Sequence, residues 1–190
     1  HAITTLGEPS FRAKSVFDNE EYSESSHGKS AHFGEDNGGA IILASGVAVG
    51  TGDYTIEFWI RTSKNGTQTI IGAPGHRLLL INGTFYDWAS NGTQTQWAIG
   101  GSAYLYQIGI WTYIAITRTS GVIKAWINGV GSSNTVTDNA DWSMTRIGSE
   151  NNTSSENFEG ELADLRITHS ALYSSDFTPP TAPLTTTPTY

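Results

Sequence analysis

One stretch decides the fold: Gly50-Thr51-Gly52-Asp53-Tyr54-Thr55-Ile56-Glu57-Phe58-Trp59-Ile60-Arg61. Successive side chains of a β-strand point to opposite sides, so this alternation separates two sets of residues. One face carries Ile56, Phe58 and Ile60, and the other carries Glu57, Trp59 and Arg61. The apolar set predicts a strand with one face in a core.

The rest of the chain repeats this pattern in short runs between Gly and Asn residues. Residues 113–118 and 122–128 are two such runs, and Thr119-Ser120-Gly121 between them is short enough for a hairpin. Asn-Gly pairs, which accept positive φ at low cost, predict antiparallel turns. They lie at residues 65–66, 82–83, 91–92 and 128–129.

This spacing predicts about ten to twelve strands over residues 30–168, too many for one flat sheet. We therefore predict an all-β fold, a two-sheet antiparallel β-sandwich of jelly-roll type. The single helix candidate is the short segment Ser170 to Ser174. Residues 1–29 are interpreted as an extended lead-in, 30–178 as the sandwich and 179–190 as a Pro/Thr-rich tail or linker in a piece of a longer protein.

Composition excludes several functions. The chain has 18 acidic and 10 basic side chains, a net charge of -8, and its basic residues are scattered, so we expect no nucleic-acid partner. Its apolar runs are far shorter than the roughly 20 residues that span a bilayer, so we expect no membrane insertion. Without cysteine there is no disulfide framework and no thiol nucleophile, and the core must be built from side chains such as the 6 Trp, 8 Tyr and 7 Phe.

Several stretches together resemble the concanavalin A-like, laminin-G-like jelly-roll domains, in particular those of bacteriophage tail and tail-fibre proteins. The stretches, which fall within residues 30–184, are Ser30 to Gly34, Gly50 to Arg61, Trp111 to Arg118, Val122 to Gly129, Phe158 to Thr168 and Phe177 to Leu184. The resemblance implies two curved antiparallel sheets that serve carbohydrate recognition or virion architecture. It also implies an extracellular or virion-surface location, with a host surface polysaccharide and other chains or domains of the same particle as partners.

The sequence predicts no catalytic residues. Glycosidases of this fold class use carboxylates that share one face of a strand, whereas Glu161 and Asp164 are three residues apart and fall on opposite faces of a regular strand. Glu57 has no acidic neighbour at two residues on either side. We interpret it as a structural partner of Arg166 in an ion pair.

No cofactor is required by any motif, but the resemblance implies a possible structural Ca²⁺. The family often has Ile-Asp-Asp in its closing strand, where this chain has Leu162-Ala163-Asp164. Asp164 and the acidic turn Glu35-Asp36-Asn37 remain as candidates, and Asp36 and Asp164 are the expected metal ligands, through carboxylate oxygens. The histidines have no zinc-ligand spacing.

An aromatic and amide-rich middle region suits sugars, because aromatic rings cover pyranose C–H groups while polar side chains bond hydroxyls. The candidate ligand-binding residues are Tyr86, Asp87, Trp88, Asn91, Trp97, Tyr104 and Tyr106. The alternative is that these rings fill the core. Arg77, in the loop from Gly72, is a further candidate that would accept an acidic sugar, unless that loop is an ordinary solvated turn.

The expected function is a non-catalytic carbohydrate-binding or host-attachment module. A purely structural virion or assembly domain, with its aromatics buried against another chain, is the alternative from a different class. A glycoside hydrolase relative is the third.

Overall fold

A computed structural model describes residues 3–6, 10–12, 24–34, 39–88, 94–103, 105–150 and 156–185. The first sheet, of seven strands, runs in the order β1 (Ile3–Leu6), β4 (Ala40–Ala48), β14 (Ser143–Ile147), β6 (Thr67–Ala73), β7 (His76–Ile81), β8 (Thr84–Trp88) and β9 (Gln94–Gln96). The second, of eight, runs β12 (Val130–Gly131), β11 (Val122–Ile127), β10 (Thr112–Thr119), β5 (Tyr54–Thr62), β15 (Gly160–Thr168), β3 (Ser30–Phe33) and β2 (Ser10–Arg12), with β13 (Val136–Thr137) on β11.

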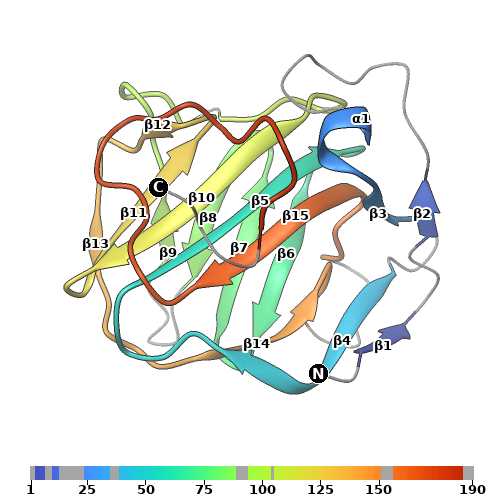
Figure 1. The fold of residues 1–190 in the computed structure, drawn as a ribbon, viewed down its shortest axis with the longest axis horizontal. Helices are drawn as coiled ribbons and strands as arrows, with labels where there is room; N and C mark the ends of the chain where they lie inside the picture. Colours follow the sequence, from blue (N-terminus) through green and yellow to red (C-terminus); the bar gives the residue numbers. More distant parts are fainter. Residues whose placement is uncertain are drawn as a thin grey trace.

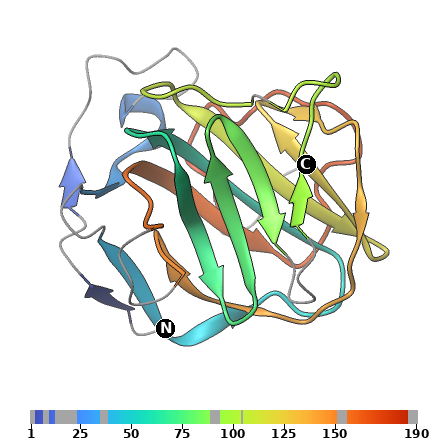
Figure 2. The same ribbon diagram turned by 180° about the vertical axis from the view of Figure 1, so that it is seen from behind.

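The two sheets face each other, as Figures 1 and 2 show from opposite sides. All pairings between the strands that the structure describes are antiparallel, for example β10 with β5 and β6 with β7. The predicted two-sheet antiparallel β-sandwich is therefore confirmed. The division into lead-in, sandwich and tail stays a prediction, although β1 and β2 of the lead-in pair with β4 and β3.

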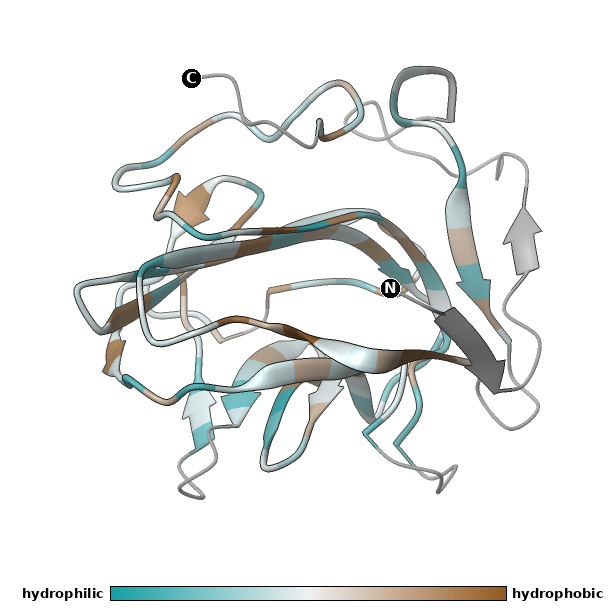
Figure 3. Cartoon of the chain, turned by 60° about the horizontal axis from the view of Figure 1, so that its bottom comes forward, coloured by the Kyte–Doolittle hydropathy of each residue, from teal (hydrophilic) through white to brown (hydrophobic). Residues whose placement is uncertain are grey.

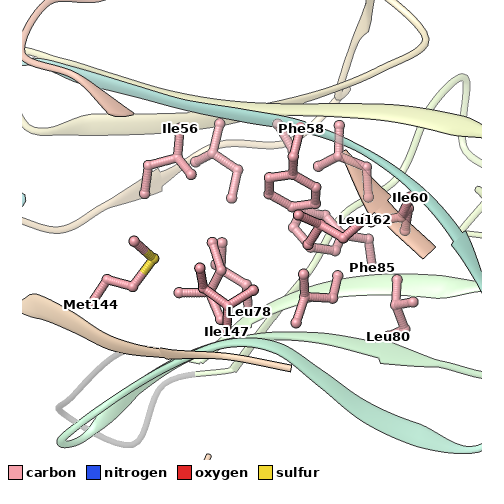
Figure 4. Close-up of a cluster of buried hydrophobic side chains, with 14 of the residues drawn as sticks. Ile56, Phe58, Ile60, Leu78, Leu80, Phe85, Met144, Ile147 and Leu162 are labelled. Carbon is pink, nitrogen blue, oxygen red and sulfur yellow. The ribbon is translucent and has the colours of Figure 1, made fainter. Parts of the chain in front are cut away.

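The main core lies between the sheets and confirms the alternation of β5. Ile56, Phe58 and Ile60 are at most 1% exposed and point toward the seven-stranded sheet. Figure 4 shows them opposite Leu78, Leu80 and Phe85, with Met144, Ile147 and Leu162 in the same cluster. Burying each of these side chains contributes about 1.5–3 kcal/mol relative to leaving it in water.

The outer face of the eight-stranded sheet is also buried, because the chain returns over it. Trp59, Tyr113 and Trp126 form a second apolar cluster on that face. Tyr173 and Phe177 pack against it, with their own rings stacked at 3.6 Å between centroids. They belong to residues 169–185, which we call the C-terminal segment; it crosses the sheet in Figure 1 and forms a separate layer above it in Figure 3.

The predicted helix at Ser170 to Ser174 is wrong. No helix forms there, because the backbone is tied to β5 instead: the hydroxyl of Thr55 donates to the carbonyl of Ser170 at 2.8 Å and accepts from the N–H of Leu172 at 2.9 Å. The one helix of the described residues is α1 (Glu24–His27). Among all the described residues, no helix is long and apolar enough to cross a membrane.

The turn predictions divide by position. Ser120-Gly121, Asn82-Gly83 and Asn128-Gly129 have positive φ at both residues and close hairpins, as predicted. Asn65-Gly66 does not reverse an antiparallel pair, since it joins β5 in one sheet to β6 in the other. Its Asn keeps a negative φ. Asn91-Gly92 lies outside the described residues.

Candidate functional site

The two outer faces of the sandwich differ in what covers them. The C-terminal segment covers the eight-stranded sheet, whereas no described segment crosses in front of β7 and β8 in Figure 2. A functional surface needs exposed side chains, so the outer face of the seven-stranded sheet is the candidate.

On this face, β8 presents its two outward aromatic residues. Tyr86 and Trp88 are partly exposed, whereas Phe85, which precedes Tyr86, and Asp87, which lies between the two, are buried. In the strand register, Arg77 pairs with Trp88 and Gln94 lies on the other side of that Trp. The Arg77 guanidinium carbon lies 4.4 Å from the centroid of the Trp88 ring, a cation–π contact that fixes the orientation of the ring.

Arg77 also binds two acidic side chains of the chain itself. Its Nη1 donates to Oε2 of Glu150 and to Oε2 of Glu156, both at 2.6 Å. The backbone next to Glu150 lies directly on β6, where a Cβ added to Gly72 would come within 2.3 Å of the Ser149 carbonyl oxygen. Only glycine at position 72 allows this close approach. The acidic pair is therefore held over β6 and β7.

A hollow of about 460 Å³ adjoins the ion pair, a size typical of small-ligand sites. Its lining comes from β4, β14, the end of β6 with the turn that follows it, and the chain just after β14. The lining residues are Ile42, Leu43, Ala73, Pro74, Gly75, Thr145, Arg146 and Glu150. Glu150 thus lies on the border between the hollow and Arg77. We call this hollow together with Arg77, Tyr86, Trp88, Glu150 and Glu156 the β7–β8 surface.

The structure brings only part of the predicted binding residues to this surface. Arg77, Tyr86 and Trp88 lie together there, but Trp97 is 0% and Tyr106 5% exposed, and both belong to the main core. The backbone N–H of Trp97 donates to the backbone carbonyl of Phe85, and this bond holds the chain against β8. These two rings cannot cover a sugar, and that part of the prediction is wrong. Asn91 and Tyr104 lie outside the described residues.

Asp87 is also displaced from the predicted site. It points into the sandwich, where its Oδ1 lies 2.9 Å from Nε2 of His76, and both side chains are almost fully buried. The His76 ring stacks on Trp142 at 4.1 Å between centroids. Asp87 therefore has a structural partner inside the fold and is not available to a ligand.

The acidic residues Glu150 and Glu156 were missed by the sequence reasoning. They are 73 and 79 residues from Arg77 in the chain. The one local sign is that they flank a polar Asn/Ser/Thr-rich stretch, which predicts a loop but not what the loop contacts.

The predicted ion pair between Glu57 and Arg166 is confirmed. Glu57 is 0% exposed, and its Oε1 accepts from Nε of Arg166 at 2.7 Å and lies 2.5 Å from Nη2. Its Oε2 accepts from the hydroxyls of Tyr173, at 2.6 Å, and Tyr113. Burial, together with the nearby Glu57 carboxylate, raises the pKa of Tyr113 well above its usual range. This cluster anchors the C-terminal segment.

Glu161 and Asp164 lie on the same face of the sheet, so the expectation of opposite faces is wrong. β15 has a bulge between Ala163 and Arg166, with Asp164 at φ 53°, which breaks the alternation. Glu161 bonds Arg61 at 3.1 Å, while Asp164 accepts from the backbone N–H of Leu184 in the C-terminal segment. Burial raises the pKa of Asp164 to about 6.

A metal site finds little support in these residues. Within the described ranges, no group of three or more His, Cys, Asp or Glu side chains converges. The charged neighbours of Asp164 include Arg166, whose positive charge opposes a cation. Asp36 lies outside the described residues, so the Asp36 and Asp164 calcium site stays a prediction.

A buried arginine ties two loops together at one end of the sandwich. The guanidinium of Arg118 donates to the carbonyls of Gly52 at 2.8 Å, of Ala140 at 2.9 Å and of Gly50. It lies 4.5 Å from the centroid of the Tyr54 ring.

Comparison with known proteins places the fold. A family model described as the concanavalin A-like lectin/glucanases superfamily matches residues 34–176. No curated protein matches the chain. Among solved structures, domain 4 of AbnA, a GH43 extracellular arabinanase from Geobacillus stearothermophilus in complex with arabinotriose, is 21% identical with a TM-score of 0.59, covering 90% of this chain and 84% of that one.

Two other similar structures are larger than this chain. The binding domain of botulinum neurotoxin DC in complex with SialylT is 16% identical with a TM-score of 0.58, and the match covers 90% of this chain and 44% of that one. A Trypanosoma rangeli sialidase in complex with 2,3-difluorosialic acid is 12% identical with a TM-score of 0.57, covering 76% and 26%. At these identities the likeness shows the fold alone.

Proposed function

The chain belongs to the concanavalin A-like lectin/glucanase superfamily, and on that premise we propose that it is a non-catalytic carbohydrate-binding module acting through the β7–β8 surface. The observation that carries the proposal is the placement of Tyr86 and Trp88. They are partly exposed and lie on one face of β8, and Arg77, which contacts the Trp88 ring, binds Glu150 at the border of the hollow. Similar structures in complex with arabinotriose and with SialylT support a glycan as the ligand class.

The chemistry of the surface fits sugar binding. An aromatic ring offers an apolar face to the C–H groups of a pyranose, and carboxylates and amides bond its hydroxyls. Trp88 supplies the ring, while Glu150 and the exposed Gln94 supply polar groups nearby. Because Arg77 already fixes the Trp88 ring, little conformational freedom is lost when a ligand binds.

The carboxylates of the described residues support binding without cleavage. Glycoside hydrolysis needs two carboxyl groups with separate roles on either side of the scissile bond. Glu57 and Glu161 are engaged in ion pairs on the face that the C-terminal segment covers. Glu150 and Glu156 both bond one guanidinium nitrogen, an arrangement that gives neither a distinct role.

The finer proposal is attachment to a host polysaccharide as part of a phage tail or tail fibre, at an extracellular or virion surface. Its support is the sequence resemblance of the closing strand and of Pro179-Pro180-Thr181-Ala182-Pro183. The assembly-domain alternative is favoured by a different observation: Ile108, Ile110, Val122 and Val130 are 41–45% exposed, which suits contact with another chain.

The test is binding of the full chain to a glycan array, followed by calorimetric titration with each glycan that binds. Trp88→Ala should lower the affinity at least about tenfold through loss of the ring contact. Because Trp88 is partly exposed, it should cost less stability than the about 3 to 5 kcal/mol of a buried Trp. Ile110→Ala, which removes an exposed apolar side chain elsewhere, is the control and should leave affinity unchanged.

Two outcomes would contradict the proposal. A blank array at millimolar sugar, together with a trimer in solution, would favour the assembly domain. Release of reducing sugar from a bound polysaccharide would make the chain an enzyme.

A further inference from the structure

We propose that the β7–β8 surface selects neutral glycans, and that Glu150 and Glu156 exclude acidic sugars by occupying Arg77. This inference rests on the proposed function and names the ligand class of the same site. It replaces the sequence-based expectation that Arg77 accepts an acidic sugar.

The first step is the engagement of the guanidinium. Binding of a sugar carboxylate by arginine is strongest when two parallel N–H groups are available. In this chain, Nη1 of Arg77 already donates to both Glu150 and Glu156 at 2.6 Å. Nε and Nη2 of Arg77 also carry N–H groups, so the obstacle to a sugar carboxylate is the negative charge of the two glutamates, which already offsets that of the guanidinium.

The second step is which partner a ligand meets first. The Arg77 side chain is 15% exposed, whereas those of Glu150 and Glu156 are 39% exposed each. The anionic members of the cluster are therefore the more accessible ones. A ligand approaching this part of the surface meets hydrogen-bond acceptors with negative charge.

The third step is the balance of charge. One guanidinium faces two carboxylates, and the second arginine of the surface, Arg146, only brings the four groups to neutrality. The whole chain has a net charge of -8. A sugar carboxylate cannot bond Glu150 or Glu156 unless one group is protonated, and these two glutamates are more exposed than Arg77, so an acidic sugar meets repulsion at them. The hydroxyls of a neutral sugar can donate to both glutamates, and such bonds to charged acceptors are the stronger kind.

The experiment compares glycans that differ only in a carboxylate. The pairs are 3′-sialyllactose as its methyl ester and as the free acid, and oligogalacturonate as its methyl ester and as the free acid. They are added to an array that also contains neutral and acidic bacterial polysaccharides. Titrations of the full chain are run at low and high salt. At low salt we expect the neutral glycans that bind to do so at least about tenfold more tightly than their acidic counterparts. The affinity of the neutral glycans should not change with salt, whereas the penalty for the acidic ones should shrink as salt screens the repulsion.

Variants then test the role of the two glutamates. Glu150→Gln combined with Glu156→Gln releases Arg77 from both charges, and should raise the affinity for the acidic partner of a pair while lowering it for the neutral one. Each single variant keeps one partner on Arg77 and should shift the preference less. Glu159→Gln, which breaks a contact with Lys64 outside this surface, is the matched control. Melting temperatures verify that each variant is folded.

The possible failures are distinguishable. If the wild-type chain binds the acidic member as tightly or more tightly, the inference is overturned and the proposed function stands. If the double variant is folded and keeps the wild-type preference, Glu150 and Glu156 do not set it. If no glycan binds, the proposed function fails and the inference with it.

Discussion

Replacing Glu57 by Gln tests whether the buried ion pair under the C-terminal segment stabilises the fold without contributing to binding. Glu57 is 0% exposed, and its two oxygens accept from Arg166, Tyr173 and Tyr113. Gln keeps the size of the side chain but removes the charge and turns one acceptor into a donor. The two tyrosine hydroxyls, which donate to Glu57, would have to turn and accept from the new amide N–H groups, and Arg166 would lose its counter-ion.

The expected cost follows from burial. Breaking a buried ion pair by removing one partner costs about 3–5 kcal/mol. Arg166 is 14% exposed and keeps its bond to the Thr185 carbonyl at 2.9 Å, which places the cost at the lower end, about 3 kcal/mol. For a chain of this length that corresponds to a fall in melting temperature of roughly 6–12 °C. Urea unfolding followed by Trp fluorescence measures it, because Trp59 and Trp126 lie in the adjacent cluster.

The control is Glu156→Gln, which removes an ion pair with Arg77. Because the Glu156 side chain is 39% exposed, this substitution should cost under about 1 kcal/mol of stability. The double variant Glu57→Gln/Arg166→Gln removes the unpaired charge and should recover part of the loss. A destabilisation by Glu57→Gln below about 1 kcal/mol would refute the reasoning. So would a loss of glycan affinity with unchanged stability, since Glu57 would then act in the binding site.

Asp164→Asn should raise the free energy of unfolding at pH 7, and the decrease of that free energy between about pH 4 and 7 should become smaller. The effect should be under about 2 kcal/mol, because the carboxyl is only half-buried. The pKa of about 6, above the usual 3.8, means that the folded state holds the proton more tightly, so this stabilisation is present at low pH and lost as the pH rises through 6; urea titrations at the two pH values measure it. Gly129→Ala should detach the C-terminal segment, because the new Cβ would lie 1.9 Å from the Phe177 carbonyl oxygen, and limited proteolysis should then cleave that segment; Gly100→Ala, also at positive φ but with nothing within 4 Å, is the control. If Ca²⁺ joins Asp36 to Asp164, a chelator should lower the melting temperature, and an unchanged melt removes the calcium prediction.

The sequence predicted the fold well because alternation and turn chemistry are local. Ile56 and Phe58 in β5 needed only their neighbours to be assigned to a core face, and Asn82-Gly83 and Asn128-Gly129 needed only positive φ. Asn65-Gly66 has the same chemistry but joins two sheets. Which strands pair after a turn is decided by contacts far away in the chain, so the same dipeptide predicted the wrong connection there.

The site was predicted less well because burial depends on those distant contacts. Alternation correctly placed Tyr86 with Trp88, but it could not tell that Trp97 and Tyr106 face the core. The β15 bulge at Asp164 shows the same limit, since one extra residue moved a carboxylate to the other face.

The apparent polar face of β5 is the strongest case of this limit, and it decides where function can lie. Glu57 and Arg61 on that face suggest solvent, yet Trp59 between them is 0% exposed. The polar groups on this face are paired, and the C-terminal segment covers the rings, so the face is a second interior. It holds more tryptophan than any other described face of the sheets, but these rings are not exposed to solvent. A sugar could reach these rings only by displacing a segment anchored through Tyr173 to a buried carboxylate. The glycan site that we propose therefore lies on the opposite sheet, where fewer aromatic side chains are present but Trp88 is partly exposed.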